Sequence, residues 1–192
     1  MAAITRTPRA KWVEAGLDAL ATGGPRAVRI EALAKGLGVT KGGFYGFFAD
    51  REALLQEMLE TWERQAIDES LAAVADEGDS RTRIHRLGML TFAEERLPVE
   101  FAIRAWAQHD ETVAARLRRV DNRRMEVLRE AISAYCDDPD EVEARSLLAF
   151  CAAIAEHFLA ADHPAGTRAE VLTRAAEFLL QSSDGADGEQ GG

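Results

Sequence analysis

Cysteine and long apolar runs are scarce in this sequence. Cys136 and Cys151 are too few for a disulfide framework, so we expect both to be reduced and to behave as small apolar residues within helices. The longest stretch without a charged residue, 146–155, has ten residues, about half of the roughly 20 needed to cross a bilayer. The first residues lack the apolar core and cleavage pattern of a signal peptide. These absences predict a folded cytoplasmic protein without a membrane span.

Motifs of catalytic sites are also missing. The sequence has no phosphate-binding glycine loop, no nucleophile elbow and no histidine three residues after a glutamate. Cys151, Glu156, His157 and His163 come close together, but a spacing of six puts Cys151 and His157 on poorly matched helix faces. We interpret this segment as a partly buried helix end and expect no enzyme, no cofactor and no metal site.

Positive charge is scarce overall but concentrated at one end. The net charge is -10, yet residues 1–50 hold seven basic residues against four acidic ones, while residues 51–192 hold 16 against 29. A positive N-terminal segment can approach phosphate while the acidic remainder is repelled. The distribution therefore keeps nucleic acid open as a partner despite the acidic total.

Convincing alternation of apolar and polar residues is absent too, whereas apolar residues recur at spacings of three and four. The sequence predicts an all-α fold of about nine helices. Their expected bounds are 8–22, 30–36, 40–47, 50 to about 76–80, 81–96, 100–108, 111–135, 140–161 and 167–181. Residues 182–192 are nearly all Ser, Asp, Gly, Glu and Gln, and we expect a disordered tail because they can bury little apolar surface.

The segment 29–55 reads RIEALAKGLGVTKGGFYGFFADREALL: a short helix, a turn with glycines and a second short helix. This spacing is typical of a helix-turn-helix, whose second helix enters the DNA major groove with its N-terminal residues nearest the base edges. Thr40, Lys41, Gly42 and Gly43 would hold those positions.

The residue types of this second helix suit DNA contact. Thr40 can cap the helix and give its hydroxyl to phosphate, near backbone amides that attract anionic oxygen, and Lys41 can reach a base edge or phosphate. Gly42 and Gly43 each weaken the helix by roughly 1 kcal/mol relative to alanine, which is tolerable where the backbone approaches DNA closely. Tyr45 can place its hydroxyl on phosphate while its ring packs.

An alternative interpretation makes the two glycines a loose loop and the aromatic residues a core plug. We prefer it for Phe44 and Phe48, because a spacing of four puts both rings on one packing face. For Thr40, Lys41 and Tyr45 we predict DNA contact.

The segment resembles the N-terminal DNA-binding domain of TetR-type regulators. That signature runs Leu-Gly-Val-Ser/Thr, a variable residue, Gly, two residues, Tyr, two residues, Phe, and the residues in register are Leu37, Gly38, Val39, Thr40, Gly42, Tyr45 and Phe48. The entry 50–55 into the next helix is also similar, and the resemblance covers about residues 8–60.

Two positions depart from the family pattern. Phe47 stands where a histidine is frequent, which removes one expected phosphate contact, and Arg29 replaces the usual Ser/Thr cap of the first helix of the pair. Arg29 can itself bind phosphate. With Arg51 it completes the DNA-binding residues that we predict.

The resemblance implies three parts: a DNA-binding domain at 1–50, a ligand-binding and dimerisation domain at 51–181, and the tail at 182–192. Residues 147–155 are apolar on all sides, and the last helix has one apolar stripe, so we predict that both helices form a four-helix dimer interface. Internal packing explains either stripe about equally well. The predicted interface residues are Phe150, Ile154, Phe158, Leu172, Phe178 and Leu179.

Aromatic residues with polar tips are the candidates for a ligand pocket, because they can both line a cavity and orient a ligand. Ordinary core positions for the tryptophans and solvent for the histidines are the alternative. The candidates are Trp62, His85, Phe92, Trp106, His109 and Tyr135.

The leading functional hypothesis is a homodimeric repressor that reads a palindromic DNA operator with two recognition helices about 34 to 36 Å apart. A small molecule would release it by favouring another spacing of these helices. The alternative hypothesis is a helical ligand-binding or enzymatic protein whose DNA-binding domain no longer functions.

Overall fold

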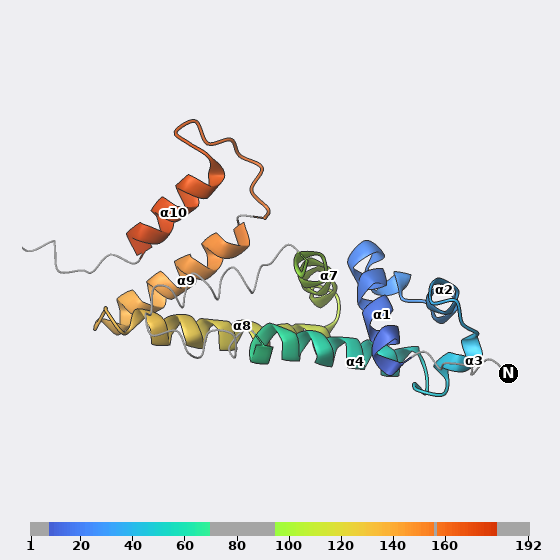
Figure 1. The fold of residues 1–192 in the computed structure, drawn as a ribbon. Coiled ribbons are helices and arrows are strands. Elements are labelled where there is room, and N and C mark those ends of the chain that lie inside the picture. Colours follow the sequence, from blue (N-terminus) through green and yellow to red (C-terminus); the bar gives the residue numbers. More distant parts are fainter. Residues whose placement is uncertain (1–7, 70–94, 156, 180–192) are drawn as a thin grey trace, which may run out of the picture. The chain divides into compact units, whose positions relative to one another are not determined.

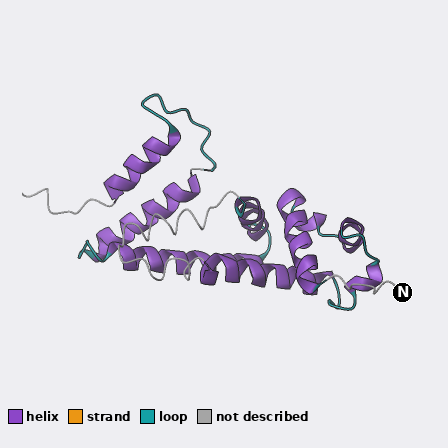
Figure 2. Ribbon diagram, viewed as in Figure 1, coloured by secondary structure: helices purple, strands orange, loops and turns teal. Residues whose placement is uncertain are grey.

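The computed structural model describes residues 8–69, 95–155 and 157–179, and within them every regular element is helical (Figures 1 and 2). None of the described helices is long and apolar enough to span a bilayer. The eight described α-helices are α1 Arg9–Gly23, α2 Ile30–Gly36, α3 Lys41–Phe44, α4 Arg51–Arg64, α7 Leu97–Ala107, α8 Glu111–Ile132, α9 Pro139–Ala155 and α10 Arg168–Leu179.

Some helix bounds differ from the prediction for identifiable reasons. Helix α3 ends at Phe44 rather than Phe47, in a glycine-rich stretch where Phe47 N–H donates to the Phe44 carbonyl as in a tighter turn. Helix α7 begins at Leu97 rather than Glu100, because Pro98 lies in its first turn, where no backbone N–H is needed. The helix expected at 81–96 and the C-terminal part of the one expected from 50 lie largely outside the described residues.

The described chain forms two compact units, and the functional division at residue 50 stays a prediction. The first consists of 8–69 with 95–121, and the second of 122–155 with 157–179. In the first unit, α1 packs against both α4 and α7 (Figure 1). Its core continues from the helix-turn-helix into α4, α7 and the start of α8, through Trp12, Leu20, Val28, Phe44, Leu54, Met58, Ile103, Val113 and Val120.

A buried network of charged groups ties α4, α7 and α8 together within the first unit. Glu100 is only 2% exposed, accepts a hydrogen bond from the Trp62 indole at 3.0 Å and pairs with Arg104 at 2.9 Å. Arg104 also pairs with Asp121 at 2.7 Å. Burial lowers the pKa of Arg104, but its bonds to Asp121 and Glu100 outweigh burial and raise the pKa above its ordinary value. A permanent cation is therefore shared by two carboxylates.

The second unit contains a smaller core. Ile132, Cys136 and Val142 are buried with Tyr135 packed against them. Cys136 and Cys151 are both free, but Cys151 is exposed, so its predicted place as a packed apolar residue is wrong. Cys136 follows α8 instead of lying within a helix.

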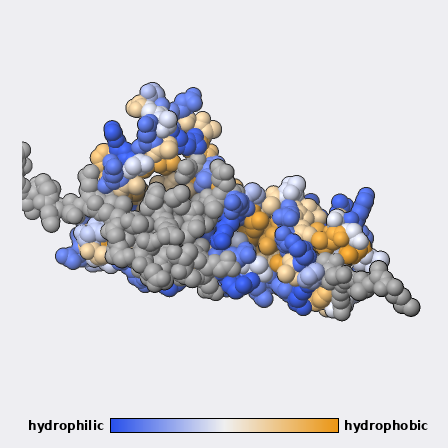
Figure 3. Space-filling view, viewed as in Figure 1, coloured by the Kyte–Doolittle hydropathy of each residue, from blue (hydrophilic) through white to orange (hydrophobic). Residues whose placement is uncertain are grey.

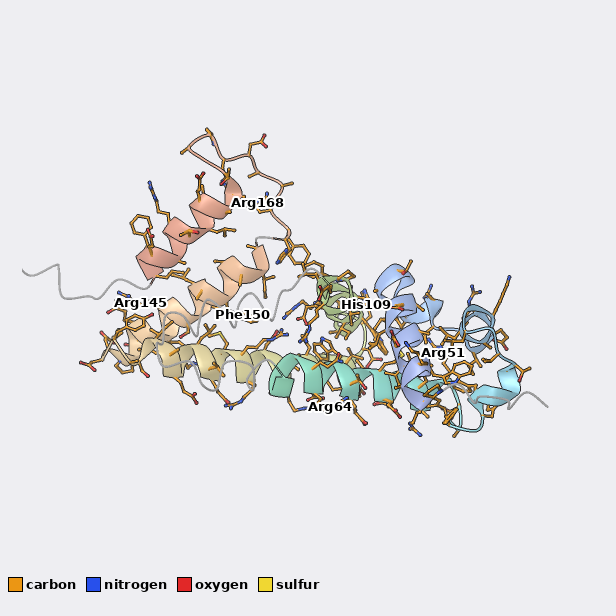
Figure 4. All side chains as sticks on the ribbon, viewed as in Figure 1. Arg51, Arg64, His109, Arg145, Phe150 and Arg168 are labelled. Carbon is orange, nitrogen blue, oxygen red and sulfur yellow. The ribbon has the colours of Figure 1, made fainter. Side chains whose placement is uncertain are left out.

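Helix α10 packs against α9 and has no buried residue. Arg145 of α9 donates to the Leu179 carbonyl at the end of α10, at 2.9 Å (Figure 4). The large apolar side chains Leu147, Leu148, Phe158, Leu159 and Phe178 are all more than half exposed. Figure 3 shows apolar residues at the surface of this pair of helices. The second unit therefore leaves apolar side chains exposed on α9, on α10 and on the segment that connects the two helices.

Candidate nucleic-acid interface

The turn between α2 and α3 sets the direction of the short second helix. Gly38 has φ +68°, a conformation that favours glycine, and its N–H donates to the Lys35 carbonyl at 3.2 Å. Val39 N–H donates to the Ala34 carbonyl at 2.9 Å, which completes the pattern of a glycine-terminated helix. The Gly-Val pair of the sequence signature therefore has a structural role.

One side of α3 is buried. Phe44 is fully buried, its ring meets Trp12 of α1 edge-on at 5.3 Å, and it stacks on Phe48 at 5.2 Å. The prediction that Phe44 and Phe48 pack rather than bind is confirmed. Phe47 is half-buried against the same core.

The other side of α3 is open to solvent. Thr40, Lys41, Gly42 and Tyr45 are exposed, and Tyr45 rests its ring edge-on against Phe44 at 5.4 Å. Thr40 occupies the N-cap position with an extended backbone, but its hydroxyl makes no capping bond. The hydroxyl is consequently not committed to the helix.

Neither glycine of α3 is required by the packing of this domain. A Cβ added at Gly43 would meet nothing within 4 Å, and one at Gly42 would lie 3.7 Å from the Thr40 hydroxyl oxygen. Neither residue has a positive φ. The domain itself would accept alanine at both positions, so their glycines suit the approach of something outside it.

Lys41 is paired with Glu31 of α2, a contact that sequence reasoning missed. The Lys41 ammonium lies 2.5 Å from the Glu31 carboxylate, and both side chains are about half exposed or more. The hydrogen bond between them lowers the pKa of Glu31 and raises that of Lys41. Both groups therefore stay charged at neutral pH.

The two predicted arginines differ in their surroundings. Arg29 is exposed at the N-cap position of α2 and makes no side-chain capping bond. Arg51 is half-buried at the start of α4 and donates to the Val28 carbonyl at 2.7 Å and to the Pro25 carbonyl (Figure 4). Arg51 thus holds the segment that leads into α2, and only its remaining donors could face DNA.

Arg9 of α1 braces the segment that directly follows α3. Its guanidinium binds the Glu57 carboxylate of α4 at 2.7 Å, donates to the Phe47 carbonyl at 2.9 Å and lies 4.6 Å above the Phe48 ring. Glu57 raises the pKa of Arg9. Sequence reasoning missed this brace, because no local signal joins residues 48 positions apart.

Replacing Arg9 with methionine should weaken DNA binding several-fold and leave the melting temperature nearly unchanged, because exposed ion pairs contribute about 1 kcal/mol or less to stability. The measurement is a DNA-binding titration beside a thermal melt. Lys11→Met removes an exposed partner of Glu14 on the same helix and serves as the matched control. Equal binding by both variants and the unchanged chain would show that the brace does not position α3.

The predicted pocket residues fall in different places. Trp62 and the half-buried Trp106 pack into the first unit's core, where the Trp106 indole donates to Asp110 at 3.2 Å. His109 is exposed after α7, and Tyr135 belongs to the second unit. His85 and Phe92 lie outside the described residues. A shared pocket for these residues stays a prediction.

The predicted dimer residues all belong to the second unit. Phe158 and Phe178 are 63% and 65% exposed. The others, Phe150, Ile154, Leu172 and Leu179, are half-buried.

Residues 13–58 match the family model of bacterial regulatory proteins, tetR family. The match begins within α1 and covers the helix-turn-helix and the first half of α4. No curated protein sequence matches this chain significantly.

Solved structures share the fold over nearly the whole chain. A candidate transcriptional regulator from Saccharomonospora viridis in complex with choline has a TM-score of 0.69 and 17% identity, over 90% of this chain and 94% of that one. A TetR/AcrR family regulator from Thermobifida fusca has a TM-score of 0.62 and 18% identity, over 91% and 97%. AmtR of Mycobacterium smegmatis has a TM-score of 0.59 and 19% identity, over 98% and 91%.

Proposed function

We propose that this chain, a DNA-binding transcriptional regulator of the TetR type, binds its operator through the open side of α3. The supporting observation is the division of that helix and its two caps: Phe44 is buried, while Thr40, Lys41, Gly42 and Tyr45 are exposed. Lys41, Thr40 and Tyr45 supply donors for phosphate or base edges, and Gly42 and Gly43 let the backbone come close. Arg29 adds an exposed cation at the start of α2, and Arg51 a partly engaged one.

The regulator acts in this proposal as a homodimer on a palindromic operator. The exposed apolar residues of α9 and α10 support it, because monomers rarely leave so many large apolar side chains in one region open to water. A twofold axis would bring α9 and α10 of each subunit together and present two copies of α3 to successive major grooves.

A small organic molecule releases the repressor from DNA in this proposal. The S. viridis protein of the same fold binds choline. Trp62 and Trp106 support this proposal, because they share one core with the DNA-binding segment. An effector changes the operator affinity only if it binds the two dimer conformations unequally.

The experiment is a gel-shift titration on DNA flanking the protein's own gene, in low and high salt. Lys41→Ala should weaken binding and reduce the slope of log affinity against log salt concentration by about 0.9. Tyr45→Phe should also weaken binding. Both variants should keep the melting temperature and the dimer mass of the unchanged chain. Absence of sequence-preferring, salt-sensitive binding at any effector concentration would favour the alternative function, a helical ligand-binding or enzymatic protein. Phe47 in place of histidine and the acidic total charge are the observations behind that alternative.

Gly43→Ala should change stability and DNA affinity in opposite directions. The free energy of unfolding should rise by about 0.5 to 1 kcal/mol, because alanine favours the helix and the site has room for a Cβ. DNA affinity should fall, because the added methyl group stands where the backbone meets the groove. Gly36→Ala, at the exposed end of α2 and equally open, is the control that should stabilise without weakening binding. Unchanged DNA affinity of Gly43→Ala would contradict the close approach.

A further inference from the structure

Glu31 is the one carboxylate in the segment that carries the proposed DNA contacts. Between residues 29 and 49 the sequence has three basic residues and this single acid. Its side chain is 68% exposed and its carboxylate lies on Lys41, the first residue of α3. A negative group therefore lies beside the surface that must approach the DNA polyanion.

The pairing reduces what Lys41 can offer to DNA. An ammonium group paired at 2.5 Å with a carboxylate contributes little net charge to a distant phosphate. If Lys41 turns to a phosphate, Glu31 loses its ammonium partner, keeps only its own backbone N–H and the weaker attraction of Arg29, and faces phosphate oxygens that repel it. Because an ionised carboxylate can only accept hydrogen bonds, nothing on the DNA backbone can replace Lys41.

Base edges do offer a replacement donor. In the major groove cytosine presents its N4 amino group, and the side chains that pair with it are Glu and Asp. On a site with cytosine within reach, Glu31 could accept from N4 while Lys41 moves to phosphate, so both groups stay satisfied. On other sequences one of them is left without a partner, which costs affinity.

We propose that Glu31 determines specificity by withholding Lys41 from phosphate until the Glu31 carboxylate accepts a hydrogen bond from a cytosine amino group. The pair thereby makes a sequence-independent contact conditional on one base in each half-site. This inference rests on the proposed DNA-binding function and adds a residue that discriminates between sequences.

The first test measures affinity for random duplex DNA as a function of salt. Glu31→Gln frees Lys41 for one more phosphate. The ratio of the variant's affinity to that of the unchanged chain should therefore rise about threefold when the salt is lowered from about 200 to about 50 mM. Glu14→Gln removes the same charge from an exposed lysine pair on α1, Lys11–Glu14 at 2.6 Å, and should leave the salt dependence unchanged. In a Lys41→Met background, Glu31→Gln should no longer alter the slope.

The second test selects binding sites from a randomised duplex pool. The unchanged chain and Glu14→Gln should both select cytosine at one position of each half-site. Glu31→Gln should lose that preference by about tenfold or exchange it for adenine, the base that glutamine pairs with, and keep the other positions. A thermal melt of each variant establishes that it is folded.

The outcomes separate the two levels of the argument. If the unchanged chain selects no sequence, both the proposed function and the role of Glu31 are overturned. If it selects a site and Glu31→Gln selects the same site with the same salt dependence, DNA binding stands and only the role of Glu31 is overturned.

Discussion

Arg104→Met should lower the free energy of unfolding at pH 7 by about 3 to 5 kcal/mol. Arg104 is the cation that pairs with the buried Glu100 and with Asp121. Its removal takes this cation away from Glu100, which is 2% exposed and also accepts a hydrogen bond from the Trp62 indole of α4. A buried carboxylate without its partner must either remain charged at a large cost or take up a proton.

The loss should depend on pH in a defined direction. Without Arg104, burial and Asp121 would raise the pKa of Glu100 in the folded chain above its unfolded value of about 4.3. The loss of unfolding free energy relative to the unchanged chain should therefore be smallest at a pH near the unfolded pKa of Glu100. It should grow as the pH rises toward the raised pKa of Glu100 in the folded variant. Urea unfolding at several pH values between about 5 and 8 measures it.

Arg119→Met is the matched control for this prediction. Arg119 pairs with Glu63 at 2.8 Å between α8 and α4, but its own side chain is 56% exposed. An exposed pair contributes about 1 kcal/mol or less, so this variant should lose little stability. Similar losses for both variants, or a loss for Arg104→Met that does not vary with pH, would show that burial of Glu100 is not the cause.

Phe44→Ala should lower the free energy of unfolding by about 3 to 5 kcal/mol and abolish operator binding at the same time. Its ring is fully buried between Trp12 and Phe48, so its removal leaves a cavity under α3 and frees that four-residue helix from the domain. Chemical unfolding and a DNA-binding titration measure the two effects.

Tyr45→Ala separates these effects. Tyr45 adjoins Phe44 in the chain but is 52% exposed, so its truncation should cost much less stability while still removing a proposed DNA contact. A comparable loss of stability in both variants would place Tyr45 in the core rather than on the contact surface.

Local signals predicted the DNA-binding segment well. Helix α2 has the expected bounds, and α4 begins where expected, capped by Asp50, which accepts from Ala53 N–H at 2.8 Å. The spacing of Phe44 and Phe48 indicated their burial, because residues four apart share a helix face. Each of these features depends on residues within a few positions of one another.

Long-range contacts in the same domain could not be predicted from the sequence. The Arg9 brace and the two carbonyls bound by Arg51 join residues 23 to 48 positions apart, and no propensity or spacing encodes such pairs. Glu31 carries no local signal of a role, because its pairing with Lys41 depends on how α2 and α3 pack. Exposure of Cys151 likewise depends on which face of α9 is covered.

The core that joins the helix-turn-helix to α4, α7 and the start of α8 has a consequence for folding. Cooperative units follow shared burial rather than functional boundaries, so residues 8–69 and 95–121 should melt in one transition. A peptide cut after residue 58 would expose the faces of α1 and α4 that α7 and α8 cover. Amide hydrogen exchange should accordingly show the same opening free energy in α1 and α7.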